Sequence, residues 1–313
     1  MEAQLLNEVL ACLCGERTVF HYYPDQYAVY LLSRQLEKRN GLPIREIKQS
    51  QWSGLLKRPA LADVVAHCGD GKLYHQDLTD LWLAEPEPFV LTLDSWGSAK
   101  NWSWDQTSRP GKNIVLQLNL SAKWSRRFKA ATKEVANEFL GYLHPHSSRR
   151  PATLAWARMD IEFDTNEVLI EEIQTDLVRE VIELRQRALD VLRYGYDSFW
   201  CAGHSLPVKP FLEFAEEFLR QFKKTWQEAM LTAALHFAFD ELGIATVYYH
   251  SFNTGNQLKN IQWRKPPKSL YTELPKKFCF QKTHEAPKLL QQEKRIKRKL
   301  KKMEDKQWFY LEA

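Results

Sequence analysis

The stretch that most constrains the fold is Val168–Leu177, a β-type run that reads V-L-I-E-E-I-Q-T-D-L. Strict alternation divides it into two faces, which carry Ile170, Glu172, Gln174 and Asp176 on one side and Leu169, Glu171, Ile173 and Thr175 on the other. Neither face is cleanly polar, so the run predicts a strand in the middle of a sheet. Because burying a bare carboxylate is costly, its acids are expected to be paired, hydrogen-bonded or catalytic.

The segment before this run, Leu154–Phe163, alternates as a partner strand should. Its apolar face carries Ala155, Ala157, Met159, Ile161 and Phe163, and its other face carries Trp156, Arg158, Asp160 and Glu162. The turn Asp164–Glu167 joins the two segments into a predicted hairpin. A four-residue loop would pair Phe163 with Val168, Asp160 with Glu171 and Met159 with Glu172, and a slip of one residue would exchange the faces.

Helical and strand patterns alternate along the rest of the 313 residues, which predicts an α/β (α+β) protein. We expect an N-terminal domain of mixed helices and strands at 1–147, a mixed-sheet domain at 148–287 and a basic helical tail at 288–313. The polar linker 144–151 sets the first boundary, and its His144 and His146 are expected to be solvated rather than metal ligands. Three short helices and an extended segment before residue 74 are also typical of a winged helix.

Further strands are predicted at Phe89–Leu93, Ile114–Leu120, Ala245–Tyr249 and Lys277–Gln281. A long loop, Asp94–Lys112, carries Trp96, Trp102 and Trp104. Long ordered loops are often functional, but we favour a loop that its tryptophans hold against the body.

Composition restricts the compartment. The five cysteines form no C-x-x-C pair, so we expect reduced thiols and no zinc site. Glu2 and Glu8 among the first leucines argue against a signal peptide, and no apolar run approaches the ~20 residues that cross a bilayer. The sequence therefore predicts a cytoplasmic protein without a membrane partner.

Three blocks of the second half resemble a known family. Leu169–Leu177 is similar to the E-I-Q-S-D signature of an uncharacterised domain found in large polyvalent proteins of phages and conjugative elements. Trp226–Thr254, which leads to Gly255, and Tyr271-x-x-Leu274-Pro275 resemble the next two blocks of that family, so the resemblance covers about 153–281. It implies a mobile-element or phage-conflict protein. In this chain Thr175 replaces the serine of the signature, and Leu177-Val178 replaces its Trp-His.

The order of elements is also similar to that of GNAT acyltransferases, whose closing Leu-Tyr pattern resembles Leu270-Tyr271 here. The resemblance implies Tyr271 as the acid that protonates a thiolate, and Glu172 or His250 as the base. A coenzyme A diphosphate needs glycines beside a helix N-terminus, and Gln174–Glu180 contains none. We therefore expect no tight binding of coenzyme A, and we expect Asp176 to cap a helix that begins at Leu177. No cofactor is identified.

A metal-dependent nuclease is a further alternative. Asp160 followed by Glu172-x-Gln174 resembles the D…E-x-K arrangement that holds Mg²⁺, with glutamine in place of lysine. The predicted hairpin register opposes Asp160 to Glu171, so we assign no metal ligands.

The basic charge of the chain is concentrated in its tail. Residues 288–306 hold nine Lys and Arg against three Asp and Glu, a local +6 in a chain of net charge +5, so the remainder is nearly neutral. One helix from about Lys288 to Lys306 is predicted, with Leu289, Ile296, Leu300 and Met303 on one side. It could bind nucleic acid or an acidic protein, or fold back on the body through Trp308, Phe309 and Tyr310. The candidate contacts are Lys294, Arg295, Lys297, Arg298, Lys299, Lys301 and Lys302.

The sequence predicts a polar site that binds a small ligand or a macromolecule and that contains Glu172, Gln174 and Asp176, with His250 and Tyr271 nearby. These five residues are also the candidates for catalysis. The sequence leaves two alternatives open: the site of an acyltransferase, which turns over a substrate, and the site of a binding protein, which does not.

Overall fold

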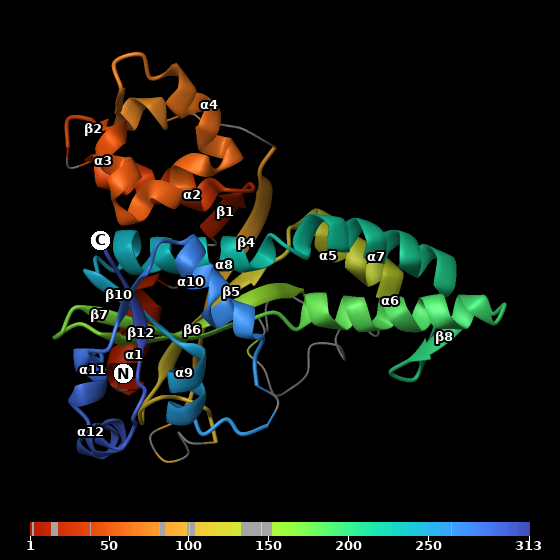
Figure 1. Ribbon diagram of the computed structural model, residues 1–313. Coiled ribbons are helices and arrows are strands. Elements are labelled where there is room, and N and C mark those ends of the chain that lie inside the picture. The colour runs from red at the N-terminus through yellow and green to blue at the C-terminus, as the bar shows by residue number, and fades with distance from the viewer. Residues whose placement is uncertain are drawn as a thin grey trace.

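A computed structural model of the chain describes residues 1, 3–13, 18–37, 39–79, 81, 85–98, 100, 104–132, 145, 152–263 and 265–313. Helices cover a large mixed sheet, so the α/β class is confirmed (Figure 1). The predicted linker 144–151 lies outside the described residues except for Pro145, and so do His144 and His146.

Eight strands of the described chain form this sheet. In spatial order they are β1 (Thr18–Tyr22), β4 (Glu87–Trp96), β5 (Asn113–Asn119), β6 (Thr153–Glu162), β7 (Glu167–Gln174), β10 (Thr246–His250), β12 (Trp308–Glu312) and β11 (Gln281–Thr283). Neighbouring strands are antiparallel except β7 and β10, which are parallel. The sheet therefore combines strands from all three predicted parts of the chain, and the predicted boundaries do not divide it.

The chain places its most apolar strands in the centre. Every residue of β5 is buried, as is nearly every residue of β6 and β7. Ala155, Ala157, Met159 and Ile161 of β6 join the main core, which confirms the predicted apolar face of this strand except for Phe163, which follows the strand and is exposed. Helix α8 (Trp226–His236) packs on β5, β6 and β7, is buried almost all round and continues as a π-turn through Phe237–Glu241.

The first helices form a unit beside α8 (Figure 1). It contains α2 (Gln26–Glu37), α3 (Ile44–Gln49), a 3₁₀ turn at Gln51–Lys57, α4 (Pro59–His67) and a 3₁₀ turn at His75–Asp77. Two short strands, β2 (Leu42–Pro43) and β3 (Lys72–Leu73), pair within it. The three short helices and the extended segment are therefore present. Helix α1 (Ala3–Leu13) precedes β1 and lies against the sheet.

A second group of elements projects from the sheet as an arm (Figure 1). It contains α5 (Ala122–Thr132), α6 (Leu177–Arg193), α7 (Val208–Phe222) and the hairpin of β8 (Ser198–Cys201) and β9 (His204–Pro207). Phenylalanines recur on α7 at helical spacing, so one apolar stripe faces α5 and α6. Phe218 and Phe222 meet the ring of Trp124 from α5 edge to face.

The last part of the chain returns to the sheet. After α9 (Phe252–Leu258) come a 3₁₀ turn (Lys268–Tyr271), α10 (Glu273–Lys277), β11, α11 (Lys288–Gln291), α12 (Lys294–Lys301) and β12. The predicted strand Lys277–Gln281 is wrong, because the chain turns there before β11. The predicted single helix Lys288–Lys306 is also wrong, because the helix breaks at Gln292–Glu293. Trp308 and Phe309 are buried, as the alternative of a docked tail predicts.

Candidate functional site

The β6–β7 hairpin differs from its predicted register. Ile161 pairs with Val168 and Asp160 with Leu169, but the pairing shifts after Met159, so that Arg158 lies opposite Glu172. Glu171 is the extra residue of a β-bulge, which re-aims side chains and breaks strict alternation. The expected pairs of Asp160 with Glu171 and of Met159 with Glu172 are therefore wrong. Ile170 and Ile173 belong to one core cluster, whereas alternation predicts opposite faces.

Glu172 is buried between two cations. Its carboxylate accepts a hydrogen bond from the Arg158 guanidinium, and Lys259 Nζ lies 4.0 Å from Oε2. All three side chains are less than a tenth exposed. Burial lowers the pKa of Lys259, and the nearby Glu172 carboxylate opposes that shift. Glu172 thus balances buried positive charge, so its role in the structure is that of a paired acid.

Glu171 binds a different pair of residues. Its Oε1 accepts the backbone N–H of Ser108 at 2.9 Å, and its Oε2 accepts the Ser108 hydroxyl at 2.7 Å. His250 Nε2 lies 3.2 Å from Oε2 and 2.9 Å from Ser108 Oγ. Burial alone would raise the pKa of Glu171, but the hydrogen bond and charge of His250 outweigh it and lower the pKa to about 2. Burial lowers the pKa of His250, with Glu171 opposing.

Ser108, His250 and Glu171 are the residue types of a hydrolytic triad, but their geometry is not that of a triad. In a triad the serine and the acid bind different nitrogens of the imidazole ring. Here both oxygens lie against Nε2, while Nδ1 has no hydrogen-bond partner among the described residues. Ser108 is fully buried. These three residues therefore fix a loop to the sheet.

The parallel strands β7 and β10 pair only as far as Ile170 and Tyr249, although β7 continues to Gln174. Beyond that point the Glu171 carbonyl accepts a hydrogen bond of 2.8 Å from Lys259 Nζ. A lysine side chain therefore occupies the position that a donor of the neighbouring strand would hold. Tyr271 lies beside this lysine, whose Nζ is 6.0 Å from the ring centroid.

Several buried polar atoms around the divergence of β7 and β10 have no hydrogen-bond partner in the described structure. They are Tyr249 Oη, Tyr271 Oη, His250 Nδ1 and Arg158 Nε. Burial and the Glu172 charge raise the pKa of Tyr271 well above its ordinary value, so its phenol stays protonated. Buried polar groups are rarely left unpaired, because each costs about 1–3 kcal/mol. Their concentration here marks the divergence as a candidate polar binding site.

Gln174 and Asp176 lie at the end of β7, and both are partly exposed. Gln174 donates to Asp176 Oδ1 at 2.7 Å, and Trp156 Nε1 donates to Oδ2 at 3.2 Å. Helix α6 begins at Leu177 as predicted, but the Asp176 side chain does not cap it. Thr175 Oγ1 instead accepts the Val178 N–H at 3.2 Å. Trp156 and Arg158 are neighbours, so Glu172 and Asp176 belong to one continuous polar layer.

Asp160, the first acid of the nuclease alternative, is also occupied. It accepts hydrogen bonds from Arg109 at 2.6 and 3.0 Å and from the Met1 ammonium at 3.2 Å. Arg109 also binds Glu162. Among the described residues, no group of three or more His, Cys, Asp or Glu side chains is placed to hold a metal ion. The observed register opposes Asp160 to Leu169 rather than to Glu171.

The tryptophan-rich loop is held mainly by polar contacts. Arg158 donates to the carbonyls of Asp105 at 2.7 Å and Gln106 at 3.1 Å, and Trp96 Nε1 donates to Asp105 O at 2.7 Å. Trp104 is 86% exposed, and Trp102 lies outside the described residues. Of these tryptophans, Trp96 anchors the loop as predicted.

The Thr254-Gly255 pair of the family resemblance has structural roles. Thr254 Oγ1 accepts the Gln307 N–H at 2.9 Å, which attaches the entry of β12 to α9. A Cβ at Gly255 would lie 3.0 Å from Cβ of His250, so a side chain there would crowd the histidine. Glycine thus allows α9 to lie close to the end of β10.

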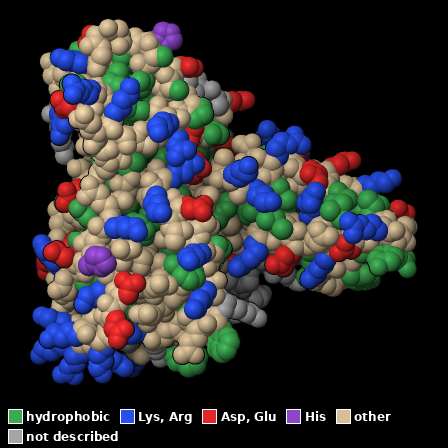
Figure 2. Space-filling view, in the orientation of Figure 1, with side chains coloured by type: hydrophobic (Ala, Val, Ile, Leu, Met, Phe, Trp, Pro, Cys, Tyr) green, Lys and Arg blue, Asp and Glu red, His purple; other side chains and the backbone are tan. Residues whose placement is uncertain are grey.

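The seven basic candidates of the tail gather on one surface. Ile296 and Leu300 anchor α12 in a small core with Leu258, Leu289 and Trp308. The basic side chains point outward and form a dense patch at the position of α12 (Figure 2). Six of them are exposed, namely Lys294, Arg295, Lys297, Arg298, Lys301 and Lys302. Lys299 is half-buried and donates to Leu258 O at 2.9 Å and to Asn260 Oδ1 at 2.7 Å.

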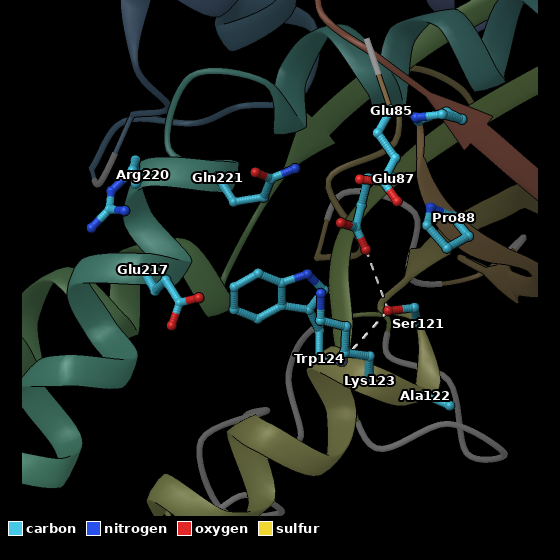
Figure 3. Close-up of a pocket in the computed structure, with 11 residues that line it drawn as sticks. Glu85, Glu87, Pro88, Ser121, Ala122, Lys123, Trp124, Glu217, Arg220 and Gln221 are labelled. Atoms are coloured by element: carbon cyan, nitrogen blue, oxygen red, sulfur yellow. Dashed lines mark hydrogen bonds between the residues drawn. The ribbon is translucent and has the colours of Figure 1, made fainter.

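A separate pocket of about 660 Å³ lies between the start of β4, the start of α5 and the end of α7. Figure 3 shows the Trp124 ring below Gln221, between Glu217 and Ser121, and Ser121 Oγ donates to Glu87 at 3.3 Å. Burial raises the pKa of Glu87, which Trp124 and Ser121 oppose. Carboxylates and cations alternate around this pocket, and none of the candidate residues lines it.

The sequence assigned no role to four of the residues that bind the acids: Ser108, Arg109, Arg158 and Lys259. Of these, only Arg158 was placed near an acid, because alternation puts it on the polar face of β6 with Asp160. The other three reach the acids from distant loops. His250 and Tyr271 lie near the divergence, and His250 contacts Glu171 rather than Glu172.

Comparison of the chain with protein-family models, with curated proteins and with solved structures finds no match. No helix in the described ranges is long and apolar enough to cross a membrane. Cys68, Cys201 and Cys279 are present as thiols.

Proposed function

We propose that this protein binds nucleic acid through the outward face of α12. The observation that carries this proposal is the set of six exposed Lys and Arg side chains at 294–302, attached to the body by a small apolar core. A helix held in this way presents its charges from a fixed backbone. Phosphate contacts of this kind supply most of the affinity in sequence-independent binding.

The buried acids of β6 and β7 do not face this surface. Ion pairs inside the protein engage Glu171, Glu172 and Asp160. The negative charges nearest α12 in the chain are Glu293, Glu304 and Asp305, which flank the helix rather than lie within it. The helix itself carries six basic residues and no acid. A polyanion is therefore the partner that its charge fits.

Substitution of Lys294, Arg298 and Lys301 by glutamine tests the proposal. These residues lie on the exposed side of α12, opposite Ile296 and Leu300, so the fold should be retained. We expect binding of a fluorescent oligonucleotide to weaken, and the slope of log K against log salt to fall by about 2 to 3. The measurement is fluorescence anisotropy between about 50 and 200 mM salt.

The matched control replaces Lys209, Lys223 and Lys224, which are exposed on or next to α7, by glutamine. It removes the same charge from the arm and should bind as the wild type does. If both triple variants weakened oligonucleotide binding equally, the affinity would depend only on the net charge of the protein, and the assignment to α12 would be overturned. If poly-glutamate competed as well as an unlabelled oligonucleotide does, the partner would be an acidic protein rather than nucleic acid.

A second function is supported by a different observation. We propose that the divergence of β7 and β10 binds a small polar ligand, because Tyr249, Tyr271, His250 and Arg158 place unpartnered buried polar atoms there. The resemblance to the polyvalent-protein domain supports this proposal, since Tyr271 and Glu172 belong to its matching blocks. An acyltransferase is the enzymatic form of this proposal, with Tyr271 as the acid.

Acetyl-CoA should nevertheless bind weakly. Asp176 accepts hydrogen bonds from Trp156, Gln174 and Arg179 at the start of α6, where a diphosphate would have to approach. Like charges ~4 Å apart repel by about 4 kcal/mol at an effective dielectric of 20. Titration calorimetry should give a dissociation constant in the millimolar range or no heat. A micromolar constant would contradict this prediction and place the acyltransferase first.

A further inference from the structure

We infer that the nucleic acid bound at α12 is single-stranded and that Trp263 stacks on one of its bases. This inference rests on the proposed function and adds the class of substrate. It starts from the segment after α9, which reads N-I-Q-W-R-K-P-P-K-S from Asn260 to Ser269. An aromatic residue among basic residues is the composition that binds single strands.

The contacts of α12 place this segment beside the basic face. Lys299 of α12 donates to Leu258 O and to Asn260 Oδ1. Trp263 follows Asn260 by three residues, so its Cα lies within roughly 11 Å of that of Asn260. Arg295 and Lys302 are four residues before and three residues after Lys299, so they lie on the same side of α12 and are the exposed members of the basic patch nearest to this segment.

Trp263 is held in place by neighbours that are buried. Ile261 and Leu270 are each less than a tenth exposed and anchor the two ends of the segment. Pro266 and Pro267 restrict the backbone between them. Trp263 itself is 84% exposed, and Lys265 and Lys268 are exposed as well. A large aromatic face is thus presented to solvent from an anchored loop.

Stacking selects single strands because the base faces of a duplex are already covered by their neighbours. Unstacked bases of a single strand are open to an aromatic ring, and every base offers such a face. The phosphates of the same strand would lie along α12, so the charge and the ring act on one ligand. The expected preference is for single strands without a fixed sequence.

The test is anisotropy titration of the full-length protein with a fluorescent dT oligomer of about 20 nucleotides, a length that exceeds the usual 4–16-nucleotide sites. Trp263→Ala should weaken binding roughly 5- to 150-fold, the range expected for one stacked base. The salt slope should stay as in the wild type, because no charge is removed. Trp263→Phe should restore part of the affinity.

Trp200→Ala is the matched control. Trp200 is 72% exposed on β8, at the opposite end of the molecule from α12 (Figure 1), and its removal should leave binding unchanged. A duplex of the same length should bind Trp263→Ala and the wild type equally.

The outcomes separate the two proposals. Wild-type binding of dT by Trp263→Ala, together with a loss in the α12 triple variant, would overturn stacking and leave nucleic-acid binding in place. Equal weakening on the single strand and on the duplex would also overturn the single-strand assignment. Failure of the wild type to bind any oligonucleotide would overturn both.

Discussion

Glu171 and Glu172 are consecutive acids with separate partners, and the β-bulge between Met159 and Arg158 separates them. Glu171 binds Ser108 and His250, whereas Glu172 binds Arg158. The sequence shows two acids on a strand that is buried on both sides. It does not show the inserted residue, because a bulge depends on the pairing of two strands rather than on one of them.

Glu172→Gln should destabilise the fold strongly. The substitution keeps the size of the side chain but leaves Arg158 and Lys259 buried without their counter-charge. Breaking a buried ion pair in this way typically costs about 3–5 kcal/mol. Urea unfolding followed by circular dichroism should show a lower midpoint with a similar slope.

Glu183→Gln is the control for this substitution, since Glu183 is exposed on α6. Its free energy of unfolding should stay within ~0.5 kcal/mol of that of the wild type. If Glu172→Gln were equally neutral, the carboxylate would not be needed as a counter-charge, and the polar layer would be available for ligand chemistry instead.

At the scale of the element, alternation and helix signals predict the strands well. Strands β4 to β7 and β10 lie within a few residues of their predicted positions, and α6 begins and ends where its amphipathic pattern does. Their signals are local, because each element buries one face. The predicted pairs within the hairpin, including Phe163 with Val168, are wrong because the loop is Phe163–Asn166, one residue earlier than predicted, so that pairing begins with Glu162 and Glu167. The bulge then shifts the pairing again between Met159 and Arg158.

The C-terminal elements were the hardest to predict. β11 has three residues and two of them are exposed, so it carries little hydrophobic pattern. β12 is an aromatic run that the sequence presents as a possible docking segment, but its place between β10 and β11 depends on contacts across the whole sheet. The spacing of Ile296 and Leu300 predicts which side of α12 is buried, but it does not predict that Lys299 turns back to Leu258 and Asn260.

At the scale of the molecule, the sheet joins parts of the chain that composition separates. The charged tail differs in composition from the body, yet β12 is an inner strand with a neighbour on each side. Thr254 and Lys299 connect the same tail to α9, which follows directly on β10. The proposed nucleic-acid surface and the polar divergence therefore both contact the C-terminal end of α9, through Lys299 and Lys259 respectively.

Removal of Lys288–Ala313 should consequently abolish the folded state rather than nucleic-acid binding alone. The deletion removes seven buried apolar side chains: Leu289, Leu290, Ile296, Leu300, Trp308, Phe309 and Leu311. Burying a side chain of this size stabilises by about 1.5–3 kcal/mol, so the seven together contribute roughly 10–21 kcal/mol, which is as large as the 5–15 kcal/mol stability of a typical domain. The deletion also exposes the backbone hydrogen-bonding groups along the edge of β10 that pairs with β12, which favours aggregation.

Size-exclusion chromatography and a thermal melt of the truncated protein measure this outcome. We expect aggregated material without a cooperative transition, whereas the Lys294, Arg298 and Lys301 glutamine variant should remain monodisperse and melt like the wild type. A truncated protein that melts cooperatively near the wild-type temperature would show that the sheet is complete without β12. Loss of oligonucleotide binding by that truncated protein would then be due to removal of the basic helix.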